Sequence, residues 1–141
     1  MNREQIYSAL FSRISEIDGF TTISRRLKHW DDVAPSEQPA LFQTQKSESV
    51  STVPGMNPVW EFNLELYIYA RSSGDPFNSP AIILNPLVDA IVAALAPNPI
   101  SNKQTLGGLV QHCWIEGAIE TDEGVLGDQA VAIIPIIMKV V

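Results

Sequence analysis

The sequence predicts an α+β fold: one compact domain with a mostly antiparallel β-sheet flanked by helices on one face. Residues 2–18 and 80–95 place apolar side chains at helical spacing, so each forms an apolar stripe. Residues 60–70 alternate strictly between apolar and polar side chains, as expected of a strand with one buried face. Residues 109–141 hold two apolar stretches around an acidic turn, the pattern of an antiparallel strand pair. This order of helices and strands favours α+β over a parallel α/β fold.

Length and charge narrow the range of functions. The 141 residues, 45% of them hydrophobic, suffice for one core, and we expect a single domain over 1–141. The net charge is −7: residues 1–71 carry seven basic and nine acidic groups, and the remainder carries two and seven. An acidic chain without a basic stripe is ill suited to sequence-specific nucleic-acid binding or to a membrane surface. With one cysteine and neither a signal peptide nor a membrane-spanning run evident, we expect an intracellular protein.

The first element is a helix predicted over 2–18. Asn2, with Gln5 three positions later, has the spacing of a capping box, and Gly19 offers a left-handed end. The apolar positions that recur on one side of this helix are Ile6, Leu10, Ile14 and Ile17. This stripe indicates a helix that faces the core.

Three strands are predicted to follow. Residues 20–29 favour a strand, and a proline-containing break separates them from a second strand over 40–51, which becomes polar toward its end. Residues 46–58 mix serine, threonine, proline and glycine without periodicity, and we expect an exposed, mobile loop there. In the strand over 60–70 the apolar side chains face the core, and the opposite face, which carries Tyr67 and Tyr69, is polar or interfacial.

The second half is predicted to contain a turn-rich connection over 71–80, a helix over 80–95 and two strands. Pro86 inside the helix leaves two alternatives: a kink, or a regular helix that begins at Asn85. The strands cover 109–120 and 129–141. Pro135 indicates a sheet edge, whereas apolar residues on both faces indicate burial, so we expect an edge strand covered by another element or subunit.

We predict no catalytic, cofactor or metal site. His112 and Cys113 are adjacent in a predicted strand and point to opposite faces, so Cys113 is expected to be a buried structural thiol. His29, Asp31 and Asp32 lack a second cluster with ligand spacing and are a weak metal signal. The carboxylates around 116–128 are expected to be solvated surface, and the glycines of 106–109 a turn.

A basic cluster, Arg25, Arg26 and Lys28, stands alone in this acidic chain and precedes two aspartates. Nucleic-acid binding is one interpretation of these arginines, but the charge balance of the chain disfavours it. The alternative is a contact surface, because guanidinium groups pair with carboxylates and the turn around 120–123 is acidic. A basic and an acidic patch on one small protein pair head to tail between copies, which gives a ring when the rotation closes.

Several segments together resemble a known family. They read RRLKHWDDV and EQPALF, then WEFNLELYIYA, LNPLVDAIVAAL, LGGLVQHCWIEGAIETDEG and QAVAIIPI. In this order they resemble the tail terminator proteins of long-tailed bacteriophages and prophages, over nearly the whole chain. The alternatives are another head–tail connector or completion protein, or a small α+β ligand-binding or enzymatic domain.

The resemblance implies a structural protein rather than an enzyme, without a cofactor. It implies a hexameric ring that caps the tail tube, stops its polymerisation and offers a joining surface to the head connector. Its partners would be copies of itself, the tail tube protein and the connector, in the host cytoplasm during assembly and at the head-proximal end of the tail in the virion. The candidate contact residues are Arg25, Arg26, Lys28, Trp30, Asp31, Asp32, Tyr67, Tyr69, Glu120, Asp122 and Glu123.

Overall fold

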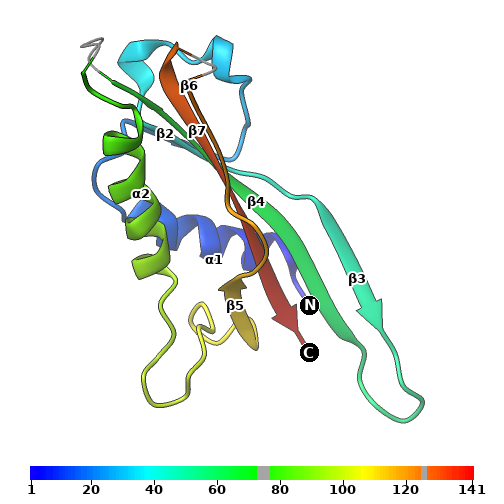
Figure 1. Cartoon of the computed structure of the whole chain (residues 1–141). Helices are drawn as coiled ribbons and strands as arrows, with labels where there is room; N and C mark the ends of the chain where they lie inside the picture. The colour runs from blue at the N-terminus through cyan, green and yellow to red at the C-terminus, as the bar shows by residue number, and fades with distance from the viewer. Residues whose placement is uncertain (73–76, 125–126) are drawn as a thin grey trace.

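The structure, a computed structural model, describes residues 1–72, 77–124 and 127–141. Within them, a seven-stranded mixed sheet packs with two α-helices in one domain (Figure 1), which confirms the predicted α+β class. The elements are α1 (Arg3–Ser15), β1 (Thr22–Ser24), two 3-10 turns (Trp30–Asp32 and Pro35–Glu37), β2 (Ala40–Gln43), β3 (Ser47–Ser51), β4 (Val59–Arg71), α2 (Ala81–Ala94), β5 (His112–Ile115), β6 (Glu120–Gly124) and β7 (Gly127–Val140). Part of the predicted connection over 71–80 and part of the acidic turn lie outside the described residues.

The sheet is built on the long antiparallel pair β4 and β7, whose register runs from Trp60 opposite Val140 to Arg71 opposite Gln129. Strands β2 and β3 follow one another along the free side of β4, and β5 and β6 along the free side of β7. Strand β1 lies parallel to β2. One end of the sheet, here the β6 end, therefore has the order β1-β2-β4-β7-β6, and the other, the β5 end, has the order β3-β4-β7-β5.

Both helices cover the same face of the sheet (Figure 1), as predicted. The Gln5 amide donates to Asn2 Oδ1 at 3.0 Å, so the expected cap forms, but α1 ends at Ser15, earlier than the predicted residue 18. Gly19 instead serves the following turn, with φ of +102°, and a Cβ at this position would lie 3.3 Å from Leu87 Cδ2. Against the helices, β4 buries its predicted apolar face: Phe62, Leu64, Leu66 and Ile68.

Helix α2 begins at Ala81 and runs continuously through Pro86, so the alternative start at Asn85 is wrong. The Ser79 hydroxyl accepts a hydrogen bond from the Ala81 amide at 3.3 Å, which satisfies one of the free amides of the first turn. The buried residues of this helix and its end are Leu84, Leu87, Ile91 and Leu95. Val92 lies beside this packed stripe and is 49% exposed.

A second, smaller core covers the opposite face at the β6 end. Residues 29–39 fold over the sheet there in two 3-10 turns. The buried members of this cluster are Val33, Ala40, Phe42, Tyr69 and Val131. Two buried glutamines connect this cover, residues 29–39, to the sheet. Gln38 Nε2 donates to Gln129 Oε1 at 2.8 Å, and Gln129 Nε2 donates to the Trp30 carbonyl at 3.2 Å.

Replacing Gln129 with leucine is expected to lower the free energy of unfolding by about 1–3 kcal/mol, because the Trp30 carbonyl loses its donor and Gln38 an acceptor. Urea unfolding followed by tryptophan fluorescence measures this change. The exposed Gln111, changed to leucine in the same way, is the control and is expected to stay within about 0.5 kcal/mol. Equal effects of the two substitutions would show that the bridge does not stabilise the cover.

Two predicted segments differ in the structure. Only Thr22–Ser24 of the strand expected over 20–29 is a strand, because the chain then leaves the sheet to cover its face. In the loop expected over 46–58, residues Ser47–Ser51 form β3, which pairs with β4. The intrinsic strand preference of this serine-rich stretch is weak, but the exposed side of the long β4 strand provides the pairing. The loop is thereby confined to residues 52–58.

Pro135 lies in an interior strand, so the predicted edge position of β7 is wrong. The strand expected over 109–120 is instead split into β5 and β6, and the split falls beside Pro135. The Pro135 carbonyl accepts from the Glu116 amide at 3.3 Å. Because the nitrogen and the carbonyl of one residue in an antiparallel strand point to the same side, the Pro135 nitrogen, which has no hydrogen, also points toward the gap between β5 and β6. The break in the neighbouring strand removes the need for a donor that proline cannot supply.

Candidate assembly surfaces

The predicted contact residues lie at both edges and on one face of the sheet. Arg25 and Arg26 follow β1 at one edge, and residues 28–32 cross the face, where the Trp30 carbonyl accepts from Gln129 of β7. Tyr67 and Tyr69 lie on β4 in the middle, and the acidic residues 120–123 belong to β6 at the other edge. The two arginines and the acidic residues of β6 are thus on opposite edges of the β6 end.

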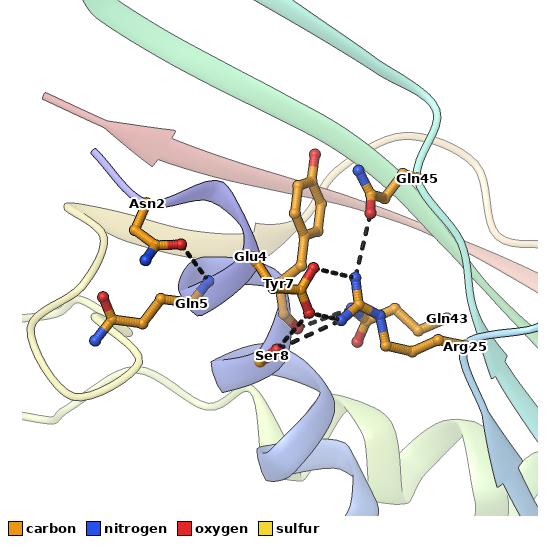
Figure 2. A network of polar contacts seen from close by, with 8 residues as sticks. All are labelled: Asn2, Glu4, Gln5, Tyr7, Ser8, Arg25, Gln43 and Gln45. Carbon is orange, nitrogen blue, oxygen red and sulfur yellow. Dashed lines mark hydrogen bonds and ion pairs between the residues drawn. The ribbon is translucent and has the colours of Figure 1, made fainter.

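Arg25 is engaged inside the protomer (Figure 2). Its guanidinium forms an ion pair with Glu4 of α1 and donates to Gln45 Oε1 at 3.2 Å and to Ser8 Oγ at 3.4 Å. The hydrogen bond from Arg25 holds the pKa of the exposed Glu4 carboxyl below its usual value, with a further contribution from Ser8. Arg25 therefore joins β1 to α1, a role that the sequence did not indicate.

Arg26 and Lys28 are the exposed members of the basic cluster. Within the described residues the Arg26 side chain has no ion pair, whereas Lys28 lies 3.3 Å from the Glu37 carboxylate. Asp31 and Asp32 are exposed in the first 3-10 turn, and the Asp31 amide donates to His29 Nδ1 at 3.2 Å. The unshared positive charge at this edge is concentrated at Arg26.

Trp30 and the two tyrosines are partly or fully packed within the protomer. Trp30 is half-buried against the second core, and its ring lies 5.0 Å from that of His29. Tyr69 is 4% exposed and its hydroxyl donates to the Lys28 carbonyl at 2.7 Å. Burial raises the pKa of Tyr69 to about 12, and burial with the nearby Glu65 carboxylate raises the pKa of the half-buried Tyr67. The prediction that Tyr69 forms a contact surface is therefore corrected: it is a core residue.

Strand β6 is an acidic sheet edge. Glu120 and Asp122 are exposed and stand opposite Ile133 and Val131 in the register. With those two apolar side chains they line a shallow hollow on the face away from the helices. Glu123 is also exposed, and it accepts a hydrogen bond from the Ser79 hydroxyl at 2.6 Å. The edge therefore offers carboxylates and an unpaired strand side.

Strands β3 and β4 form a projecting hairpin (Figure 1), and its outer strand falls within the loop predicted over 46–58. Its outer strand and tip expose three apolar side chains, Val50, Val53 and Met56, at 47%, 57% and 72%. The length of the alternating strand over 59–71 could have predicted this hairpin, because a strand this long needs more pairing strands than β2 alone. Exposed apolar groups on a projecting element are typical of a contact surface.

The potential nucleophile Cys113 is buried in the main core, which agrees with its predicted structural role. Burial raises the pKa of the Cys113 thiol to about 12. His112, its neighbour, instead lies beside Trp114, with ring centroids 4.9 Å apart, and its Nδ1 accepts from the Gln104 amide at 3.0 Å. The imidazole is therefore engaged with the Gln104 loop and with Trp114.

Cys113 in the native protein is expected to react with a chromogenic disulfide reagent at least about 100-fold more slowly than in the urea-unfolded chain, because both the thiolate and access are suppressed. Absorbance of the released thiolate at pH 8 follows the reaction. In partly denaturing urea the rate is expected to track the unfolded fraction. Fast native labelling would contradict the buried position.

A scan of the sequence against protein-family models finds no match, and a search of curated proteins finds none. Across residues 1–72, 77–124 and 127–141, neither α-helix has the length and apolar character needed to cross a membrane. In the same part of the chain, histidine, cysteine and carboxylate side chains do not gather in threes as a metal site would need.

Proposed function

We propose that this chain is a tail terminator of a long-tailed phage or prophage. In this proposal it forms a ring, hexameric by resemblance, that caps the tail tube, ends tube polymerisation and presents a surface to the head connector. The resemblance of successive sequence segments supports it. The protein would act without catalysis or a cofactor, in the host cytoplasm and then at the head-proximal end of the tail.

The observation that carries the proposal is the pair of unlike sheet edges. At the β6 end, one edge exposes Arg26 beside β1, and the other exposes the carboxylates of Glu120 and Asp122 on β6. Contacts between two different edges are heterologous, and such contacts generate a ring when the rotation between subunits closes. Opposite charges at these edges would steer copies into the same register.

The projecting hairpin supports the same function. In a ring, the tip that carries Val53 and Met56 would reach beyond the subunit that bears it (Figure 1), toward a neighbouring copy or the last disc of the tube. Burying these side chains would favour the assembled state. Residues 52–58, which carry Val53 and Met56, would become ordered by the contact.

Electron microscopy of tails assembled without this chain tests the proposal. A terminator is expected to leave tubes that exceed the normal length and vary widely, because nothing stops polymerisation. Tails of normal length that lack heads would instead assign the chain to the connector. Adding back the purified protein should restore a single length.

The size of the purified protein distinguishes the remaining alternative, a ligand-binding or enzymatic domain. Light scattering after size-exclusion chromatography, with and without purified tube, is expected to detect a ring in at least one condition. A protein that stays monomeric in both and does not bind tube ends would contradict a ring-forming cap.

A further inference from the structure

A second surface, at the β5 end, carries chemistry that the proposed ring does not use. It is a hollow of about 420 Å³ beside strand β5, between the loop before it and the end of β7. The residues that line it come from three separate stretches of the chain: Ser101, Asn102, Lys103, Gln111, His112, Trp114 and Lys139.

Each side chain that lines this hollow carries a hydrogen-bond donor, although most of the lining surface is apolar. The donors are hydroxyl, amide, ammonium, imidazole and indole groups, and no acidic side chain is among the lining residues. This is unexpected in a chain with sixteen acidic and nine basic residues. Lys103 and Lys139, the only two basic residues after Arg71, both line the hollow although they lie far apart in sequence. The surface therefore favours an anion.

The loop that supplies Lys103 is held in place by its own hydrogen bonds. Asn98 Oδ1 accepts from the amides of Ile100 and Ser101 at 2.9 and 3.2 Å, and the Asn98 amide donates to the Lys103 carbonyl at 2.9 Å. Asn102 adopts a left-handed conformation, with φ of +59°, which closes the loop. The backbone that presents these donors is thus organised within the chain itself.

The two aromatic side chains that line the hollow, His112 and Trp114, are also held in place by contacts within the chain. Because His112 Nδ1 accepts the Gln104 amide, the neutral imidazole carries its proton on Nε2, which remains a donor. The ring is stacked on Trp114 at an interplanar angle of 14°. His112 stands opposite Lys139 in the pairing of β5 with β7, so imidazole and ammonium share one face of the sheet.

Glu61 is the competing group. It stands opposite Lys139 on the other side, in the pairing of β4 with β7. Within the described residues, however, the two side chains form no ion pair, and Glu61 does not line the hollow. The Lys139 ammonium is therefore available to a ligand.

We propose that this hollow binds a phosphate group. Near pH 7 a phosphate carries a charge of about −1.5 to −2, which matches the charge of two ammonium groups. A single carboxylate would leave one of the two ammonium charges uncompensated. Its several acceptor oxygens also suit a wall of separate donors. The site does not depend on ring formation, and it takes inorganic phosphate or the phosphate of a small ester.

Titration of the full chain with inorganic phosphate, followed by amide NMR, tests the site. Sodium chloride holds the ionic strength constant, because exposed charges are screened by salt. Shifts are expected around residues 101–103, 111–114 and 139. Lys103→Gln and Lys139→Gln are each expected to weaken binding about tenfold, since each removes a charged donor. Glu61→Gln is expected to strengthen it.

Lys46→Gln is the matched control: it removes the same charge from a lysine paired with Glu65 outside the hollow, and it should leave binding unchanged. Adenosine monophosphate in a parallel titration shows whether an ester is preferred, and tighter binding of either phosphate supports the site. Equal weakening by Lys46→Gln would overturn the proposal. So would identical shifts with chloride alone, or full binding by the folded Lys103→Gln variant.

Discussion

Replacing Phe62 with alanine is expected to lower the free energy of unfolding by about 3–5 kcal/mol, the range of large aromatic truncations in a core. Phe62 is fully buried at the centre of the sheet, and its ring stacks on Tyr7 of α1 at 5.4 Å. It also pairs in register with Met138 of β7 and Glu48 of β3. One truncation therefore opens a cavity where α1 meets three strands.

Urea unfolding at constant pH measures this loss, with Phe62→Leu and Val50→Ala as comparisons. Leucine keeps part of the volume and is expected to cost less than half as much as alanine. Val50 is an exposed residue of the same hairpin, and its truncation is expected to stay within about 0.5 kcal/mol. A small effect of Phe62→Ala would mean that α1 does not pack on β4 as described.

Reversing the charge of the β6 edge is expected to abolish association between copies. In the double variant Glu120→Lys and Asp122→Lys, lysines would face Arg26 of the neighbour in the proposed ring. Like charges at an interface cost several kcal/mol, so association should weaken by at least about 100-fold. Light scattering measures ring formation, alone or on tube ends, and electron microscopy measures tail length.

The charge swap makes this test specific. Adding Arg26→Glu to the β6 double variant is expected to restore part of the association, whereas Arg26→Glu alone should weaken it. Arg25→Gln is the neighbouring control: because Arg25 pairs with Glu4 inside the protomer, its loss should lower the melting temperature and leave association intact. Unchanged assembly after both charge reversals would remove the two edges from the proposed interface.

Much of the fold was predictable because strong periodic patterns agree with burial. The strand through Phe62 and Ile68 and the α1 stripe appear in the structure with the predicted faces. The errors concern segments in which tertiary contacts decide the conformation. Serine-rich Ser47–Ser51 becomes a strand because β4 lies beside it. The strand expected over 20–29 ends at Ser24, because the chain then leaves the sheet and packs over its face.

The contact residues were less predictable, because a charge cluster does not show where its charges go. Arg25 and Arg26 are adjacent and chemically equal, yet one is held by Glu4 and the other is exposed. Likewise Tyr67 and Tyr69 share one face of a strand, and only Tyr69 is covered by residues 29–39. The donor-lined hollow was also missed, since Lys103 and Lys139 are far apart in sequence and line one hollow only in the folded chain.

The outer strands on both sides of the sheet are interrupted at one level, by residues 44–46 beside β4 and by residues 116–119 beside β7, where Glu65 stands opposite Pro135. The sheet is not weakened to two strands there, because the Thr44 and Lys46 amides still donate to the Glu65 and Asn63 carbonyls of β4 at 3.0 Å. One main core also lies under both ends, with Ile68 and Ala132 at the β6 end and Phe62 and Met138 at the β5 end. The β6 edge and the hairpin are therefore expected to move as one rigid body when the subunit docks.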